Sequence, residues 1–65
     1  MRLYMAVFSG NQLVRVVQAV NESRETIQAH PNGLLIYAIV RAESLANAEQ
    51  MGRDIAIRYR ERKTF

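Results

Sequence analysis

The apolar run at residues 33–40, GLLIYAIV, constrains the fold of this chain more than any other stretch. It is the longest uninterrupted apolar run in the sequence. The turn dipeptide Asn32-Gly33 precedes it, and its Ile, Val and Tyr residues favour extended structure. We therefore expect a strand at residues 34–40 against which the other elements pack.

The size of the chain limits how it can be stabilised. Its 65 residues make one domain, 1–65, with no cysteine and a single histidine. A chain this short buries only about 60% of its unfolded surface, so a disulfide, a metal or a partner chain often assists folding. The composition excludes disulfides, thiolate metal sites and a multi-histidine zinc site within one chain. Self-association is the remaining aid, although a well-packed core also lets such a chain fold alone.

The N-terminal third predicts a β-hairpin. Residues 2–8, RLYMAVF, have two apolar faces, which is typical of a strand inside a sheet. Gly10 and Asn11 tolerate the positive φ that tight hairpins need. Residues 12–20 are rich in Val, with Arg15 on one face. We expect this second strand to be partly solvated.

The middle of the chain is the most ambiguous part. Asn21 or Ser23 could cap a helix, and Glu22 and Glu25 favour its first turn. We expect a helix at residues 22–29, ended by the sequence HPNG at residues 30–33. A helix of two turns is marginal without packing. An irregular loop with one helical turn is the alternative.

The C-terminal third predicts a long amphipathic helix at residues 45–62, with Ser44 as its N-cap. Apolar and small residues recur at helical spacing along one stripe. The stripe consists of Leu45, Ala48, Gly52, Ile55, Ala56 and Tyr59. Gly52 lies in its middle, where glycine costs about 1 kcal/mol relative to alanine. We expect Gly52 to permit close approach of the helix to the sheet, and Ile57, off the stripe, to be partly exposed.

These elements predict an α+β domain of order β-β-α-β-α. A right-handed crossover places the third strand beside the first, which gives a three-stranded antiparallel sheet of order 2-1-3 with two helices on one face. The most apolar strand then lies at an edge, and one sheet face is bare. Exposed apolar edges and faces invite pairing with another chain. We therefore expect a homodimer, with Leu35, Tyr37 and Ile39 at its interface.

Catalytic chemistry has little support in the sequence. His30 could act as a general base with Glu25 nearby, but a histidine before proline is also ordinary at a helix end. Surface charge accounts for the carboxylates, and the three glycines are isolated, so no phosphate-binding loop is present. We expect no catalytic, cofactor-binding or metal-binding residues and no enzymatic activity.

The C-terminal charges are the sharpest functional signal. The net charge of +3 arises largely in residues 50–65, which hold five basic and two acidic residues. Arginines beside an exposed apolar residue favour a protein partner. The predicted partner-binding residues are Arg53, Ile57, Arg58, Arg60 and Arg62. Nucleic-acid binding by this basic helix is the alternative, although Arg58, Arg60 and Arg62 point in different directions on a helix.

We therefore expect a small non-catalytic binding module that acts through protein–protein contacts, as a modulator or inhibitor of a larger partner. Chains this compact are often encoded by phages or other mobile elements. Tyr4, Tyr37 and Tyr59 could stack on bases, but core or interface packing is the more ordinary role of tyrosine. No apolar run approaches the ~20 residues of a membrane-spanning helix, so we expect a cytoplasmic protein without membrane contact.

Overall fold

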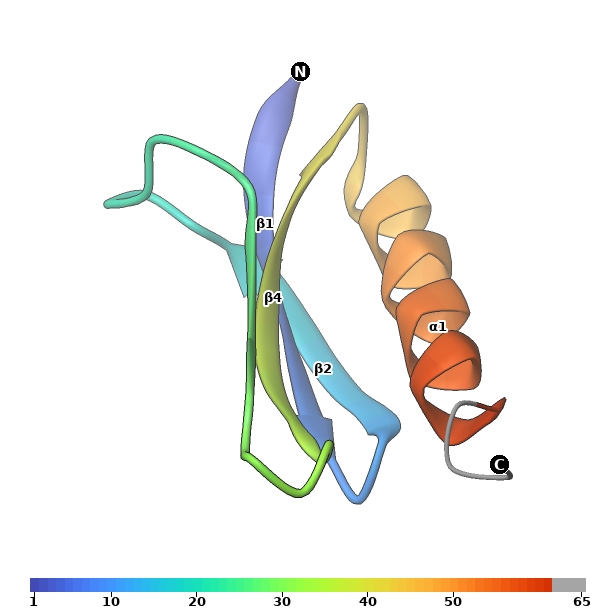
Figure 1. The fold of residues 1–65 in the computed structure, drawn as a ribbon. Helices are drawn as coiled ribbons and strands as arrows, with labels where there is room; N and C mark the ends of the chain where they lie inside the picture. The colour runs from blue at the N-terminus through green and yellow to red at the C-terminus, as the bar shows by residue number, and fades with distance from the viewer. Residues whose placement is uncertain (62–65) are drawn as a thin grey trace.

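A computed structural model describes residues 1–61 and arranges them as a four-stranded sheet with one helix (Figure 1). The elements are β1 (Arg2–Ser9), β2 (Gln12–Gln18), β3 (Thr26–Ala29), β4 (Leu35–Ala42) and α1 (Leu45–Glu61). The strands pair antiparallel in the order β2-β1-β4-β3. The predicted α+β class and the β1–β2 hairpin are confirmed.

The predicted helix at residues 22–29 is wrong, and so are the predicted element order and three-stranded sheet. Thr26–Ala29 is a strand paired with β4, from Thr26 opposite Ile39 to Ala29 opposite Leu35. A two-turn helix would have been marginal in isolation. The adjacent β-branched pair Thr26-Ile27 fits a strand better, and the exposed edge of β4 supplies hydrogen-bonding partners. Long-range pairing therefore overrides the weak helical signal.

This fourth strand changes the position of the apolar run. β4 lies inside the sheet, between β1 and β3, and not at the predicted edge. Leu35 and Ile39 are accordingly only 3% and 1% exposed. The exposed apolar edge that favoured a homodimer does not exist, because β3 covers it.

The connection between β2 and β3 crosses from one edge of the sheet to the other. In Figure 1 it passes on the side of the sheet opposite α1. Residues 19–22 of this connection line a shallow depression together with Met5. The sheet face away from the helix is therefore partly covered by the chain itself.

The core lies between the sheet and α1. Alternate residues of β1 and β4 point toward the helix: Tyr4 stands opposite Val40, and Ala6 opposite Ala38. From the helix, Ala48, Gly52 and Ala56 are buried, as the stripe predicts, whereas Leu45 is exposed. Small residues on both sides bring the two layers close together.

Gly52 is the point of closest approach, as predicted. A Cβ atom at this position would lie 3.0 Å from Leu13 Cδ1 and 3.3 Å from the Ala6 Cβ. Only a residue without a side chain fits there without displacing its neighbours.

Ser44 caps α1, as predicted. Its Oγ accepts a hydrogen bond from the Asn47 backbone N–H at 3.1 Å. In return, the Asn47 side chain accepts one from the Glu43 N–H at 3.2 Å. This reciprocal arrangement satisfies two backbone donors and fixes where the helix leaves β4.

Candidate functional site

The single helix is too narrow to cover the four-stranded sheet. α1 packs against β1, β2 and β4 but not against β3. One depression follows each side of the helix, between α1 and β2 and between α1 and β3. We call them the β2 groove and the β3 groove.

The β2 groove has a volume of about 400 Å³. Four consecutive residues of β2, at positions 12–15, form one wall. The other wall is a single stripe of α1 at helical spacing. It consists of Glu49, Arg53, Ala56, Ile57 and Arg60. The groove therefore runs between an edge strand and a helix that is anchored in the core by Ala48, Gly52 and Ala56.

The β2 groove combines positive charge with exposed apolar surface. Its helix wall includes two arginines, Arg53 and Arg60, and among the described lining residues only Glu49 opposes them. Arg15 belongs to the strand wall but stands opposite Val7, on the sheet face away from α1. Within residues 1–61 the side chains of Arg15 and Arg53 make no hydrogen bond or ion pair. Val14 is 59% and Ile57 42% exposed. Available guanidinium groups beside exposed aliphatic side chains are typical of the centre of a protein interface.

Arg60 also has a structural contact at the end of the β2 groove. Its Nη1 donates to the backbone carbonyl oxygen of Asn11 at 3.3 Å. Asn11 is 1% exposed, and its Oδ1 accepts the Leu35 N–H at 2.7 Å. This asparagine thus links the β1–β2 turn to the start of β4 and to the last turn of α1.

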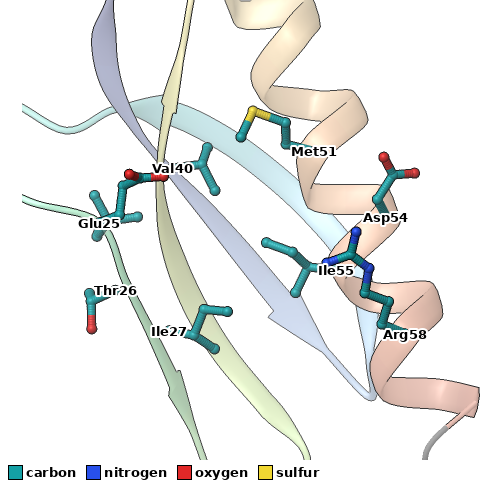
Figure 2. Close-up of a pocket in the computed structure, with 9 residues that line it drawn as sticks. Glu25, Thr26, Ile27, Val40, Met51, Asp54, Ile55 and Arg58 are labelled. Carbon is teal, nitrogen blue, oxygen red and sulfur yellow. The ribbon is translucent and has the colours of Figure 1, made fainter.

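The β3 groove is larger, about 520 Å³, and more apolar (Figure 2). Ile27 and Val40 point into it from the strands, and Met51 and Ile55 from the helix. Charged groups at its rim are Glu25, Asp54 and Arg58. Asp54 accepts a hydrogen bond from Gln50 at 3.1 Å. This groove occupies the place that the predicted second helix would have filled.

The structure divides the predicted partner-binding residues between the two grooves. Arg53, Ile57 and Arg60 line the β2 groove, whereas Arg58 lines the β3 groove on the other side of the helix. Arg62 lies outside the described residues. Sequence reasoning missed Val14 and Arg15 as members of this surface. The available signal was the interruption of an apolar strand by Arg15.

The three residues predicted at the dimer interface differ in how much of their side chain is exposed. Tyr37 and Ile39 point to the sheet face away from α1, by alternation from Ala38. Leu35 instead belongs to the hydrophobic cluster beneath α1. The pairing of β3 with β4 shifts in register between Gln28 and Ala29, and Ala29 stands opposite Leu35. Leu35 and Ile39 are buried and Tyr37 is half-buried. Tyr37 is therefore the residue of the three that can contribute most to a contact.

The titratable groups are dispersed over the described chain. His30 is exposed in the β3–β4 turn and lines neither groove. Residues 1–61 contain no group of three or more His, Cys, Asp or Glu side chains close enough to hold a metal ion. No helix in that range has the length and apolar character to cross a bilayer.

Comparisons with known proteins give no relative. No family model matches the sequence, and neither the curated proteins nor the solved structures contain a significant match. Function must therefore be argued from the chemistry of the two grooves.

Proposed function

We propose that this protein is a small, non-catalytic, cytoplasmic binding module that acts through protein–protein contact, with the β2 groove as its partner surface. It acts as a modulator or inhibitor of a larger protein, and its proposed source is a phage or another mobile element. One observation carries the proposal. Arg53 and Arg60 stand beside the exposed Ile57 and Val14 in one concave surface.

The physical argument concerns what each component contributes to binding. Burying Ile57 and Val14 supplies about 25 cal/mol per Å² of apolar surface removed from water. The guanidinium groups provide planar donors for carboxylates of a partner and set its orientation. Because both walls belong to packed elements, little conformational entropy is lost on binding.

The charge reversal Arg53→Glu tests this surface, with Arg58→Glu as the matched control. Both change the same charge on the same helix, but Arg58 lines the opposite groove. Wild-type protein and R58E should retain one defined partner from a nuclease-treated native lysate, identified by mass spectrometry. R53E and Ile57→Asp should retain less than about a tenth of it, because both remove interface-centre contacts. Equal capture by R53E and R58E would exclude the β2 groove.

Nucleic acid is the second candidate, and Arg53 and Arg60 of the β2 groove favour it. Phosphate contacts by arginine give an affinity that falls steeply with salt. Titration of duplex and single-stranded DNA at increasing salt separates the candidates. Absence of DNA binding at low salt excludes nucleic acid as the partner. If instead the DNA affinity falls steeply with salt and R53E reduces that dependence, the β2 groove does not bind proteins alone.

Self-association remains part of the proposal in a narrower form. The remaining candidate is the sheet face away from α1, where Val7 and Tyr37 are half-buried neighbours. We expect a homodimer at micromolar concentration by sedimentation velocity, which Tyr37→Glu converts to monomer because it buries a charge in the contact. A wild-type monomer under these conditions would remove the dimer from the proposal.

A further inference from the structure

β2 is an edge strand, and the β2 groove lies beside its first four residues. The Ala19 N–H donates to Leu3 O at 3.0 Å, which extends the β1–β2 register by one residue. In an antiparallel ladder, alternate residues turn their N–H and C=O groups toward the neighbour. Val17 and Arg15 therefore pair with β1, while the backbone groups of Val16 and Gln18 point away from the sheet.

The helix stripe beside this edge would contact any added strand. Residues 12–15 of β2 and the stripe with Arg53, Ile57 and Arg60 line the same groove. A strand that paired with β2 would present alternate side chains on the helix side of the sheet. Those side chains would lie next to two guanidinium groups and one exposed aliphatic side chain.

We infer that the partner docks an extended acidic segment as a fifth strand on β2, with its helix-side carboxylates paired to Arg53 and Arg60. This inference rests on the proposed function and specifies how the partner is bound. Main-chain hydrogen bonds to an open sheet edge give affinity, and side-chain contacts to flanking groups give specificity. Two arginines, Arg53 and Arg60, against Glu49 make the helix wall of the groove complementary to a negatively charged strand.

A second copy of the chain fits this edge poorly. Arg15 is the central residue of β2, Gln12–Gln18. Symmetric antiparallel pairing of two β2 strands with full overlap would place the two Arg15 side chains opposite each other. Like charges directly opposite in a sheet are destabilising. The charge of the edge therefore favours an acidic partner over self-pairing.

A synthetic peptide of alternating Glu and Val, acetylated and amidated, tests the inference by fluorescence anisotropy and amide hydrogen exchange. A Lys/Val peptide of equal length and a Glu/Val peptide with a central proline are the controls. The acidic peptide should bind and slow exchange at Val16 and Gln18. R53E should weaken binding about tenfold, since it replaces an attraction with a repulsion. R58E should change it less than about twofold.

Several results would overturn the inference. One is that the Lys/Val peptide or the proline-containing peptide binds as tightly as the Glu/Val peptide. Another is that the Glu/Val peptide leaves amide exchange at Val16 and Gln18 unchanged. A third is that the wild-type protein binds single-stranded DNA but neither of the two acidic peptides. If the peptide fails while R53E still abolishes partner capture, strand addition is wrong and the proposed function stands. If the peptide binds as expected while no protein is captured, the acidic-strand site stands and the proposed function fails.

Discussion

Replacing Asn11 with alanine is expected to lower the free energy of unfolding by about 2–5 kcal/mol. Two effects add. The buried Leu35 N–H loses its acceptor, which costs about 1–3 kcal/mol. Asn11 also has a φ of 60°, and a Cβ-bearing residue without a local polar side chain loses a further 1–2 kcal/mol or so in that left-handed region. Urea unfolding followed by circular dichroism measures the loss.

Two variants separate these effects. Asn11→Gly removes the side chain but accepts positive φ freely, so it should be about 1 kcal/mol more stable than N11A. Asn11→Asp keeps the oxygen that accepts the Leu35 N–H and tolerates positive φ, but it replaces the donor aimed at Gly33 O, 3.5 Å away, with a second oxygen and buries a charge at a site that is 1% exposed. It should therefore also be less stable than wild type. If N11A unfolds within 0.5 kcal/mol or so of wild type, Asn11 is not the structural link that its burial indicates.

Replacing Gly52 with valine is expected to destabilise the protein by about 2–3 kcal/mol through overpacking. An added Cβ atom alone would lie 3.3 Å from the Ala6 Cβ, which is held in the inner strand β1. The two further methyl groups of valine would force α1 away from the sheet. Because α1 forms one wall of each groove, displacement should also weaken partner capture.

The difference in helix propensity between glycine and other residues also changes the stability of a Gly52 variant, so it needs its own control. Ala46 is exposed in the first turn of α1, so Ala46→Gly should lose at most the interior propensity difference of about 1 kcal/mol. Gly52→Ala gains that same term but must displace Leu13 Cδ1, which is 3.0 Å away at the end of a flexible side chain. G52A should therefore remain close to wild type. Wild-type stability of Gly52→Val in urea would show that the two layers are not as tightly fitted as the geometry indicates.

Local patterns predicted the elements whose physical cause is local. The hairpin was predicted from two apolar runs separated by the Gly10-Asn11 turn. Both turn residues have positive φ, as a tight hairpin requires. A Ser cap and a repeating stripe defined α1. In each case the signal lies within a few residues of the structure it specifies, so an isolated sequence contains it.

β3 could not be predicted in this way. Its four residues, TIQA, have no alternation long enough to distinguish a short strand from a helical turn. Their conformation depends on pairing with β4, which begins only after the turn at residues 30–34. The same error placed the apolar run at an edge and predicted two helices where residues 1–61 form one.

The candidate site was predictable in part. Helical periodicity alone groups Arg53, Ile57 and Arg60, at spacings of four and three, and separates Arg58 from them. The structure places Arg58 in the other groove, in agreement with that geometry. Val14 and Arg15 could not be added, because no local pattern states which strand lies beside that stripe.

The sequence by itself determined the hairpin, the long capped helix with its glycine contact, and a chain whose size and composition rule out disulfides. Those properties follow from residue type and short-range spacing. Only the tertiary structure decided that residues 35–42 are central, that β2 is an edge strand, and that β2 lies beside the helix stripe with Arg53 and Arg60. Strand pairing and layer packing bring together residues distant in sequence, and their free energy depends on the whole arrangement.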